Sequence, residues 1–186
     1  MSYHNNEFII KPKESYRFLK NCQGCGGKSS FINTGNYRVN ANGNRVDVWL
    51  IYQCEKCKHT YNLTIHERIK PSELSAEEYG RYLANDSELA MQHGMDKNIL
   101  AQNKVEIDWD SLSYELKPLN ETVQPTEYII IQNPYQVRVR MDKVLSGILK
   151  VNRSRIKDLI KQEVIELAID QVKHTITAVI KENNIS

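Results

Sequence analysis

Two pairs of cysteines constrain this chain more than any other feature. The pairs are Cys22–Cys25 and Cys54–Cys57, each with two residues between its members, and the 186-residue chain has no other cysteine. A two-residue spacing lets one tight turn present both thiolates to a single ion, and two such turns complete a tetrahedral four-thiolate set. We therefore predict one structural Zn²⁺ bound by all four cysteines, with iron in the same site as the minor variant.

The alternative is a local disulfide within each pair. A redox-active C-x-x-C needs a helix N-terminus to lower the thiol pKa, but Cys25 is followed by Gly26-Gly27 and then by a strand-like run. The N-terminal residues show no basic region followed by a long apolar stretch, as a secretory signal would. We therefore expect a cytoplasmic protein, in which thiols stay reduced and free for metal.

The residues between the pairs predict a ribbon of strands. Residues 31–40 and 45–52 read as strands joined by a turn at Asn42-Gly43, and residues 60–65 read as a third strand after the second pair. Residues 1–70 are thus predicted to form a zinc ribbon, a three-stranded antiparallel sheet with metal-bearing turns. Because the strand at 45–52 is apolar on both faces, we expect both faces to be covered.

Composition describes a soluble globular protein without a membrane span. The chain is 40% hydrophobic and 26% charged, and no apolar run approaches the length that crosses a bilayer. The net charge of +2 conceals a segregation: +6 in residues 1–70, −8 in 71–135 and +4 in 136–186. Basic ends favour contact with nucleic acid. The alternative is that the acidic middle packs against the basic ends within the same chain.

Lysines also flank the two cysteine turns, where they allow two interpretations. Four thiolates around Zn²⁺ leave a formal charge of −2, which nearby cations would balance, but the same lysines could face phosphate. These residues are Lys20, Lys28, Lys56 and Lys58.

Residues 71–134 are predicted to be a helical, acidic middle segment. Ser75 and Glu78 fit a capping box for a helix over 76–84. Further helices are expected over 85–94 and 96–102 and a strand over 105–109, followed by an irregular acidic connector at 110–127. We find no catalytic pattern in this segment.

The C-terminal residues 135–186 predict two short helices and a hairpin. Apolar residues from Met141 to Leu149 recur with helical spacing, and Asn152 can cap a second helix. On that second helix Arg153, Lys157 and Lys161 recur every four residues and share one face. Residues 164–167 and 176–181 are expected to form the closing hairpin.

This C-terminal pattern resembles the alpha-L RNA-binding module, the S-four type named after a small-subunit ribosomal protein. The resemblance lies in Arg140-Met141-Asp142-Lys143-Val144-Leu145 and in Asn152-Arg153-Ser154-Arg155-Ile156-Lys157-Asp158-Leu159-Ile160. It departs from the family at Gln162-Glu163, where a glycine turn is usual. The resemblance implies RNA contacts by six cations: Arg140, Lys143, Arg153, Arg155, Lys157 and Lys161.

Over its full length the chain resembles a bacterial family of unknown function. The shared features are the first C-x-x-C, the runs YRVNA at 37–41 and VDVWLIYQC at 46–54, then Cys57, the Trp109 region and the Arg-x-Asp-x-x-Leu segment. This resemblance implies a domain order but no activity.

The combined prediction is an α+β chain in three parts: a zinc ribbon at 1–70, a helical middle segment and acidic connector at 71–134, and an alpha-L-like module of two helices plus a hairpin at 135–186. We predict a non-catalytic, zinc-binding protein that binds ribosomal or other structured RNA. The alternative is a protein-interaction adaptor that uses the ribbon and has no nucleic-acid role.

An enzyme is the third class, and the sequence argues against it. Four cysteine ligands leave no open position on a zinc ion and no thiol nucleophile. The five histidines form no recognisable catalytic pair, so we expect surface or packing roles for them: His4, His59, His66, His93 and His174.

Overall fold

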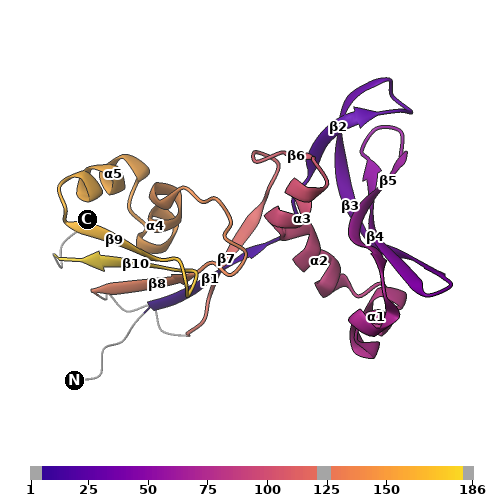
Figure 1. The fold of residues 1–186 in the computed structure, drawn as a ribbon. Coiled ribbons are helices and arrows are strands. Elements are labelled where there is room, and N and C mark those ends of the chain that lie inside the picture. The colour runs from indigo at the N-terminus through magenta and orange to yellow at the C-terminus, as the bar shows by residue number, and fades with distance from the viewer. Residues whose placement is uncertain (1–5, 121–126, 182–186) are drawn as a thin grey trace. The chain divides into compact units, whose positions relative to one another are not determined.

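The chain folds into two compact units, seen here in a computed structural model that describes residues 6–120 and 127–181. Unit 2 comprises residues 13–113, and unit 1 combines residues 1–12 with residues 114–186. Unit 2 is therefore inserted in the sequence between the first strand of unit 1 and the remainder of unit 1. Figure 1 shows both units as ribbons, and each is described separately.

Unit 2 is built on a five-stranded sheet in the order β5-β4-β3-β2-β6, in which every neighbouring pair is antiparallel. The strands are β2 (Phe18–Cys22), β3 (Gly27–Asn42), β4 (Arg45–Cys54), β5 (Thr60–Ile69) and β6 (Glu106–Ile107). Along β4 alternate residues from Val46 to Cys54 are buried, while those between them are half-buried. One face of this strand thus lies in the core and the other is only partly covered.

Three helices pack on the buried face of this sheet. They are α1 (Ala76–Leu83), α2 (Ser87–Met95) and α3 (Lys97–Gln102), preceded by the short 3₁₀ helix η1 (Pro71–Glu73). The Ser75 hydroxyl caps α1 by accepting a hydrogen bond from the Glu78 amide at 3.0 Å. Val46 and Val48 of β4 meet Tyr82 of α1 and Leu89 of α2 in one apolar cluster. Burial of this shared cluster attaches the helices to the sheet.

The outer edge of β5 is covered by one side chain of the segment after α3. The Asn103 amide accepts a hydrogen bond from the Thr64 N–H at 2.8 Å and donates one to the Thr64 carbonyl at 2.9 Å. This pair of bonds imitates a neighbouring strand and satisfies backbone groups that an edge strand otherwise leaves open.

Unit 1 contains a second five-stranded sheet, in the order β7-β1-β8-β10-β9. Its strands are β1 (Asn6–Pro12), β7 (Tyr114–Pro118), β8 (Tyr128–Gln132), β9 (Ile165–Asp170) and β10 (Thr175–Ile180). β1 pairs antiparallel with β7 and parallel with β8, so the N-terminal strand lies inside the sheet. β10 then joins β8 to the edge strand β9.

Two helices cover one face of the unit 1 sheet, α4 (Met141–Leu149) and α5 (Arg153–Lys161). The Asn152 side chain caps α5 by accepting a hydrogen bond from the Arg155 amide at 2.8 Å. Leu145 of α4 and Ile156 of α5 are fully buried, as are Ile129 and Ile131 of β8. The core of unit 1 therefore lies between these helices and the central strands.

The predicted fold class is wrong. Strand accounts for 42% of the described residues and helix for 26%, and the chain forms two separate sheets. Residues 71–113 do not form a helical segment of their own, because their helices share the core of the unit 2 sheet. The C-terminal helices and hairpin do not form a separate two-helix module either. β10 pairs with β8 and β8 with β1, so they complete a sheet that begins at the N-terminus.

The units also divide the chain differently from the three predicted segments. The contact boundaries fall at 12/13 and 113/114 instead of near 70 and 134. Within the predicted irregular connector at 110–127, residues Tyr114–Pro118 form β7, and the strand predicted at 105–109 is reduced to β6. His4 and residues 121–126 of the connector lie outside the described residues. None of the helices in the described ranges is long and apolar enough to span a membrane.

Candidate metal centre and basic face

The two cysteine turns of unit 2 have the same local geometry. In the turn between β2 and β3 the Gly26 amide donates to the Cys22 carbonyl at 2.9 Å, and in the turn between β4 and β5 the Lys58 amide donates to the Cys54 carbonyl at 3.0 Å. The residue after each pair adopts a left-handed conformation, with φ of 70° at Gly26 and 63° at Lys58. Two equivalent turns thus present their sulfurs at the same end of the sheet.

The four sulfurs converge on one point. All four Sγ atoms lie within 4.8 Å of one another, with Cys22 and Cys57 3.4 Å apart and Cys25 and Cys54 3.7 Å apart. All four thiols are free. Tetrahedral coordination with Zn–S bonds of about 2.3 Å requires sulfurs about 3.8 Å apart. The donor set therefore fits one four-coordinate ion, and the cysteines form a candidate metal centre.

Gly24 shows how closely the two turns approach. A Cβ atom added at Gly24 would lie 2.9 Å from the Cys57 Sγ and 3.4 Å from the His59 Cβ, whereas a Cβ atom at Gly27 would meet nothing within 4 Å. Only a residue without a side chain at position 24 leaves room for the opposite sulfur. The turn sequence is thus adapted to the pairing of the two turns as well as to its own bend.

Backbone hydrogen bonds and burial shift the pKa values of two of the thiols. Hydrogen bonds from the amides of Cys57 and Lys56 lower the pKa of the Cys54 thiol, which favours the thiolate form that binds a metal. Burial raises the pKa of the Cys22 thiol. A bound divalent cation would offset that effect, because ligation deprotonates a thiol.

Several cations near the turns already contact groups of unit 2. Lys28 forms an ion pair with Glu106 at 2.6 Å, Lys58 donates to the Glu55 carbonyl at 3.2 Å, and Lys20 lies 4.8 Å from the Tyr61 ring centroid. None of these three contacts involves a cysteine sulfur, so both interpretations of the lysines stay predictions.

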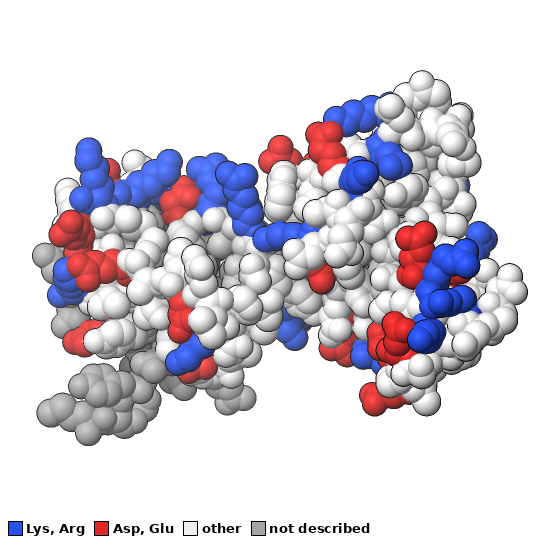
Figure 2. All heavy atoms as spheres, in the orientation of Figure 1, with Lys and Arg blue, Asp and Glu red and all other residues white. Residues whose placement is uncertain are grey.

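A different set of cations gathers over α4 and α5 of unit 1, as Figure 2 shows. Asp142, whose side chain is only 11% exposed, is the centre of this arrangement. It accepts hydrogen bonds from Arg153 at 2.8 Å and from Arg140 at 3.4 Å, and Lys157 lies 3.9 Å away. The Arg153 guanidinium is the main cause of the lowered pKa of the Asp142 carboxyl. One anion thus holds three cations of the two helices in place.

The charges of the other three predicted cations are not balanced by an ion pair within the described residues. Within residues 6–120 and 127–181, Lys143, Arg155 and Lys161 form no ion pair, and Lys143 and Lys161 are exposed. We call the six predicted cations together the basic face. Between residues 140 and 161 the chain has seven Lys or Arg residues and two Asp residues, so the face keeps a net positive charge.

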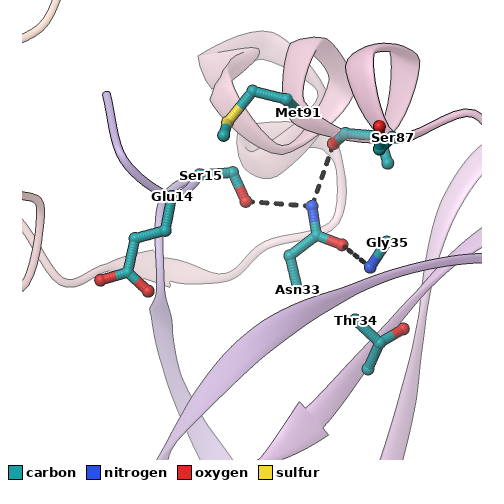
Figure 3. Close-up of a pocket in the computed structure, with 8 residues that line it drawn as sticks. Glu14, Ser15, Asn33, Thr34, Gly35, Ser87 and Met91 are labelled. Atoms are coloured by element: carbon teal, nitrogen blue, oxygen red, sulfur yellow. Dashed lines mark hydrogen bonds between the residues drawn. The ribbon is translucent and has the colours of Figure 1, made fainter. Parts of the chain in front are cut away.

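A polar groove in unit 2 lies between helix α2 and the bulge of strand β3 (Figure 3). Its volume is about 190 Å³. The Asn33 amide donates to the Ser15 hydroxyl at 3.0 Å and to the Ala90 carbonyl at 2.9 Å, and it accepts from the Gly35 amide at 2.8 Å. Because the polar atoms of Asn33 are used in these bonds, we interpret the groove as part of the packing between helix and sheet.

Two histidines and their neighbours form a polar cluster between α1, α2 and the sheet of unit 2. The Tyr82 hydroxyl donates to Glu78 at 2.6 Å and lies 3.1 Å from His66 Nε2. The Tyr37 hydroxyl lies 2.9 Å from His93 Nδ1. The Tyr82 hydrogen bond lowers the pKa of Glu78, and burial lowers the pKa of His93. These contacts join helices to strands, as expected of packing histidines.

Comparison with known proteins places the chain in a family. Residues 39–171, well over half of the chain, match the family described as "Protein of unknown function (DUF1062)". The chain belongs to this family. The family resemblance predicted from the sequence is thereby confirmed, although the match begins after Cys22 and Cys25 and carries no activity. No curated protein and no solved structure matches the chain.

In this DUF1062 protein the four cysteines predicted to share one ion do lie close together, but two positions that organise the candidate sites were missed. Gly24 could have been recognised only with the opposite turn in view, because its neighbour Cys57 is distant in sequence. Asp142 was visible as the acidic residue of the Arg-x-Asp pattern, but its contacts with α5 depend on how the two helices pack.

Proposed function

We propose that this protein is a non-catalytic, zinc-stabilised protein that binds structured RNA through the basic face of unit 1. The observation that carries the proposal is the Asp142 network, which holds cations of α4 and α5 in fixed positions beside unpaired ones. Preorganised cations lose less side-chain entropy when they meet phosphates. The proposal rests on charge and geometry and does not require the alpha-L fold.

The shape and composition of the basic face indicate which kind of RNA it would bind. The basic face lies on the outward side of two short helices and has no aromatic residue between Arg140 and Lys161 on which bases could stack. Such a surface recognises a phosphate backbone by charge and spacing, which selects shape more than sequence. RNA with double-helical elements supplies phosphates at fixed spacing.

A lysine-neutralising variant tests the RNA interaction. Lys143→Gln/Lys157→Gln/Lys161→Gln removes three exposed cations without touching the apolar core. We expect affinity for an immobilised pool of structured RNA to fall at least about tenfold, and the slope of log K against log salt to shrink by about two to three. The readout is retention of the RNA across a salt series.

The matched control removes the same charge elsewhere in unit 1. Lys11→Gln/Lys117→Gln/Lys173→Gln changes lysines of β1, of β7 and of the turn between β9 and β10. If the control loses as much affinity as the test variant, the basic face has no special role. If neither variant changes retention, the proposed RNA interaction is wrong.

The zinc part of the proposal has its own test. Purified protein is expected to contain one zinc per chain by mass spectrometry, and iron would instead colour the sample. Gly24→Ala forces a Cβ towards the Cys57 sulfur, so we expect about a tenfold or greater loss of zinc affinity. Gly27→Ala, which meets open space, is the control and is expected to retain zinc.

A protein-interaction adaptor remains the second candidate. The sequence assigned the interaction to the ribbon, but the observation that favours an adaptor lies in unit 1. The hairpin of β9 and β10 exposes apolar side chains, with Ile169 70% and Val172 90% accessible. Recovery of one stoichiometric protein after nuclease treatment, lost in an Ile169→Lys/Val172→Lys variant, would support this function in place of RNA binding.

A further inference from the structure

The four cysteines of the candidate metal centre differ in exposure, and the difference follows a pattern. The first cysteine of each turn, Cys22 or Cys54, is buried, and the second, Cys25 or Cys57, is exposed. An oxidant arriving from solvent therefore meets Cys25 or Cys57 first. Each turn has one exposed cysteine and one cysteine that is buried at the end of a strand.

All four sulfurs lie within 4.8 Å of one another, and two close contacts join sulfurs of different turns. Cys57 lies 3.4 Å from Cys22, and Cys25 lies 3.7 Å from Cys54. The sulfur of each exposed cysteine thus lies beside that of a buried cysteine of the opposite turn. This is the arrangement of an oxidisable cysteine with a resolving partner.

We propose that the metal centre is a redox switch in which a hydroperoxide releases the metal and converts the four thiolates into two cross-turn disulfides, Cys22–Cys57 and Cys25–Cys54. The inference rests on the metal-binding part of the proposed function. It adds a regulation of that site and identifies the class of oxidant.

The chemistry balances without a further reactant. An exposed thiolate attacks one oxygen of hydrogen peroxide, which breaks the O–O bond, expels hydroxide and leaves a sulfenic acid. The buried thiolate of the opposite turn attacks that sulfur and expels a second hydroxide as the S–S bond forms. Each disulfide thus consumes two thiolates and one peroxide and yields two hydroxides. Two peroxides oxidise all four ligands, and the dication leaves because disulfide sulfur is a poor ligand.

Which cysteines form the disulfides determines whether the end of the unit 2 sheet stays intact after the metal is lost. Cross-turn disulfides join the turn between β2 and β3 to the turn between β4 and β5, as the metal would. The sheet end therefore stays closed after the metal is lost, and a thiol reductant can regenerate the site. Disulfides within each turn would leave the two turns unconnected, and oxidation would then open this end of unit 2.

The test uses the full-length, zinc-loaded protein. It is treated with two equivalents of hydrogen peroxide, released zinc is followed with a chromogenic chelator, and disulfides are assigned by peptide mapping without reduction. We expect about one zinc released per chain, peptides linked as Cys22–Cys57 and Cys25–Cys54, and recovery of zinc binding after reduction and addition of zinc. A sample oxidised in denaturant is the matched control. It should favour the short loops Cys22–Cys25 and Cys54–Cys57, because loop closure favours near neighbours in an unfolded chain.

Each other outcome overturns the inference. Links within the turns in the folded protein, sulfinic or sulfonic acids in place of disulfides, or zinc retained at this dose would each contradict it. If the purified protein binds no zinc, the metal part of the proposed function fails separately. The reduced, metal-free chain can still be mapped, and links within the turns would show that the sulfur pairing is also wrong.

Discussion

Unit 2 places four cysteines at the end of its sheet, whereas the sequence of unit 1 contains no cysteine. Both units have a five-stranded sheet with helices on one face. In unit 1, strand β1 pairs with both β7 and β8, so that distant parts of the chain meet in one sheet and one apolar core. Unit 2 has mostly hairpin connections, and each of its cysteine turns has one buried and one exposed cysteine. We therefore predict that burial alone stabilises unit 1, whereas unit 2 depends also on the metal proposed for its four cysteines.

The sharpest way to break this comparison is to remove one metal ligand. Cys54→Ser replaces a buried sulfur, and we expect loss of the metal and a destabilisation of unit 2 by more than about 5 kcal/mol, because metal binding and folding are coupled. Hydrogen exchange should show lost protection in β3, β4 and β5 and unchanged protection in β8 and β10. Full protection in unit 2 would mean that its apolar core suffices.

The reverse experiment removes core volume from unit 1. Ile131→Ala truncates a fully buried side chain of β8, and we expect a loss of about 2–5 kcal/mol confined to unit 1. Metal content should not change. Equal loss of exchange protection in β3 and β4 would show that the two units unfold together.

A pair of glycines tests how closely the helices of unit 2 approach its sheet. In Gly94→Ala the new Cβ would lie 2.7 Å from the Asn33 Nδ2 of β3 and 2.5 Å from the Ser15 Oγ, so we expect a destabilisation of about 1–3 kcal/mol. Gly80→Ala in α1 meets open space and should stabilise by up to about 1 kcal/mol. Denaturant titration of both variants measures the contrast, and equal effects would contradict the close contact.

The smallest expected effect concerns pH. Burial lowers the pKa of His93, so the unfolded chain takes up its proton first, and stability falls as the pH drops below about 6.5. The lowered pKa of Glu78 adds a contribution that is present above about pH 4.3 and is lost as the pH falls further. His93→Gln, compared with the parent by thermal unfolding from pH 7 to 5, should reduce the slope. An identical slope would show that His93 does not titrate with folding.

The sequence predicted local structure where the signal lies within a few residues. Ser75 and Asn152 cap helices as their positions indicated, because a cap depends on the next turn alone. The two C-x-x-C turns also formed as expected, since their spacing fixes the bend. The sequence did not predict strands whose pairing partners are distant in the chain. The run at 114–118 was read as irregular, since a short polar strand is recognisable only beside its partner β1.

By itself, then, the sequence determined the cysteine turns, the helix caps and the segregation of charge, all of which depend on neighbouring residues. The tertiary structure decided that β1 joins β7 and β8, that α1 to α3 share a core with the cysteine-bearing sheet, and that Asp142 organises the basic face. It also decided that the sulfur of each exposed cysteine lies beside that of a buried cysteine of the opposite turn. These features join residues far apart in the chain. They follow from which apolar surfaces are buried together, and that is set by the whole fold and not by any single segment.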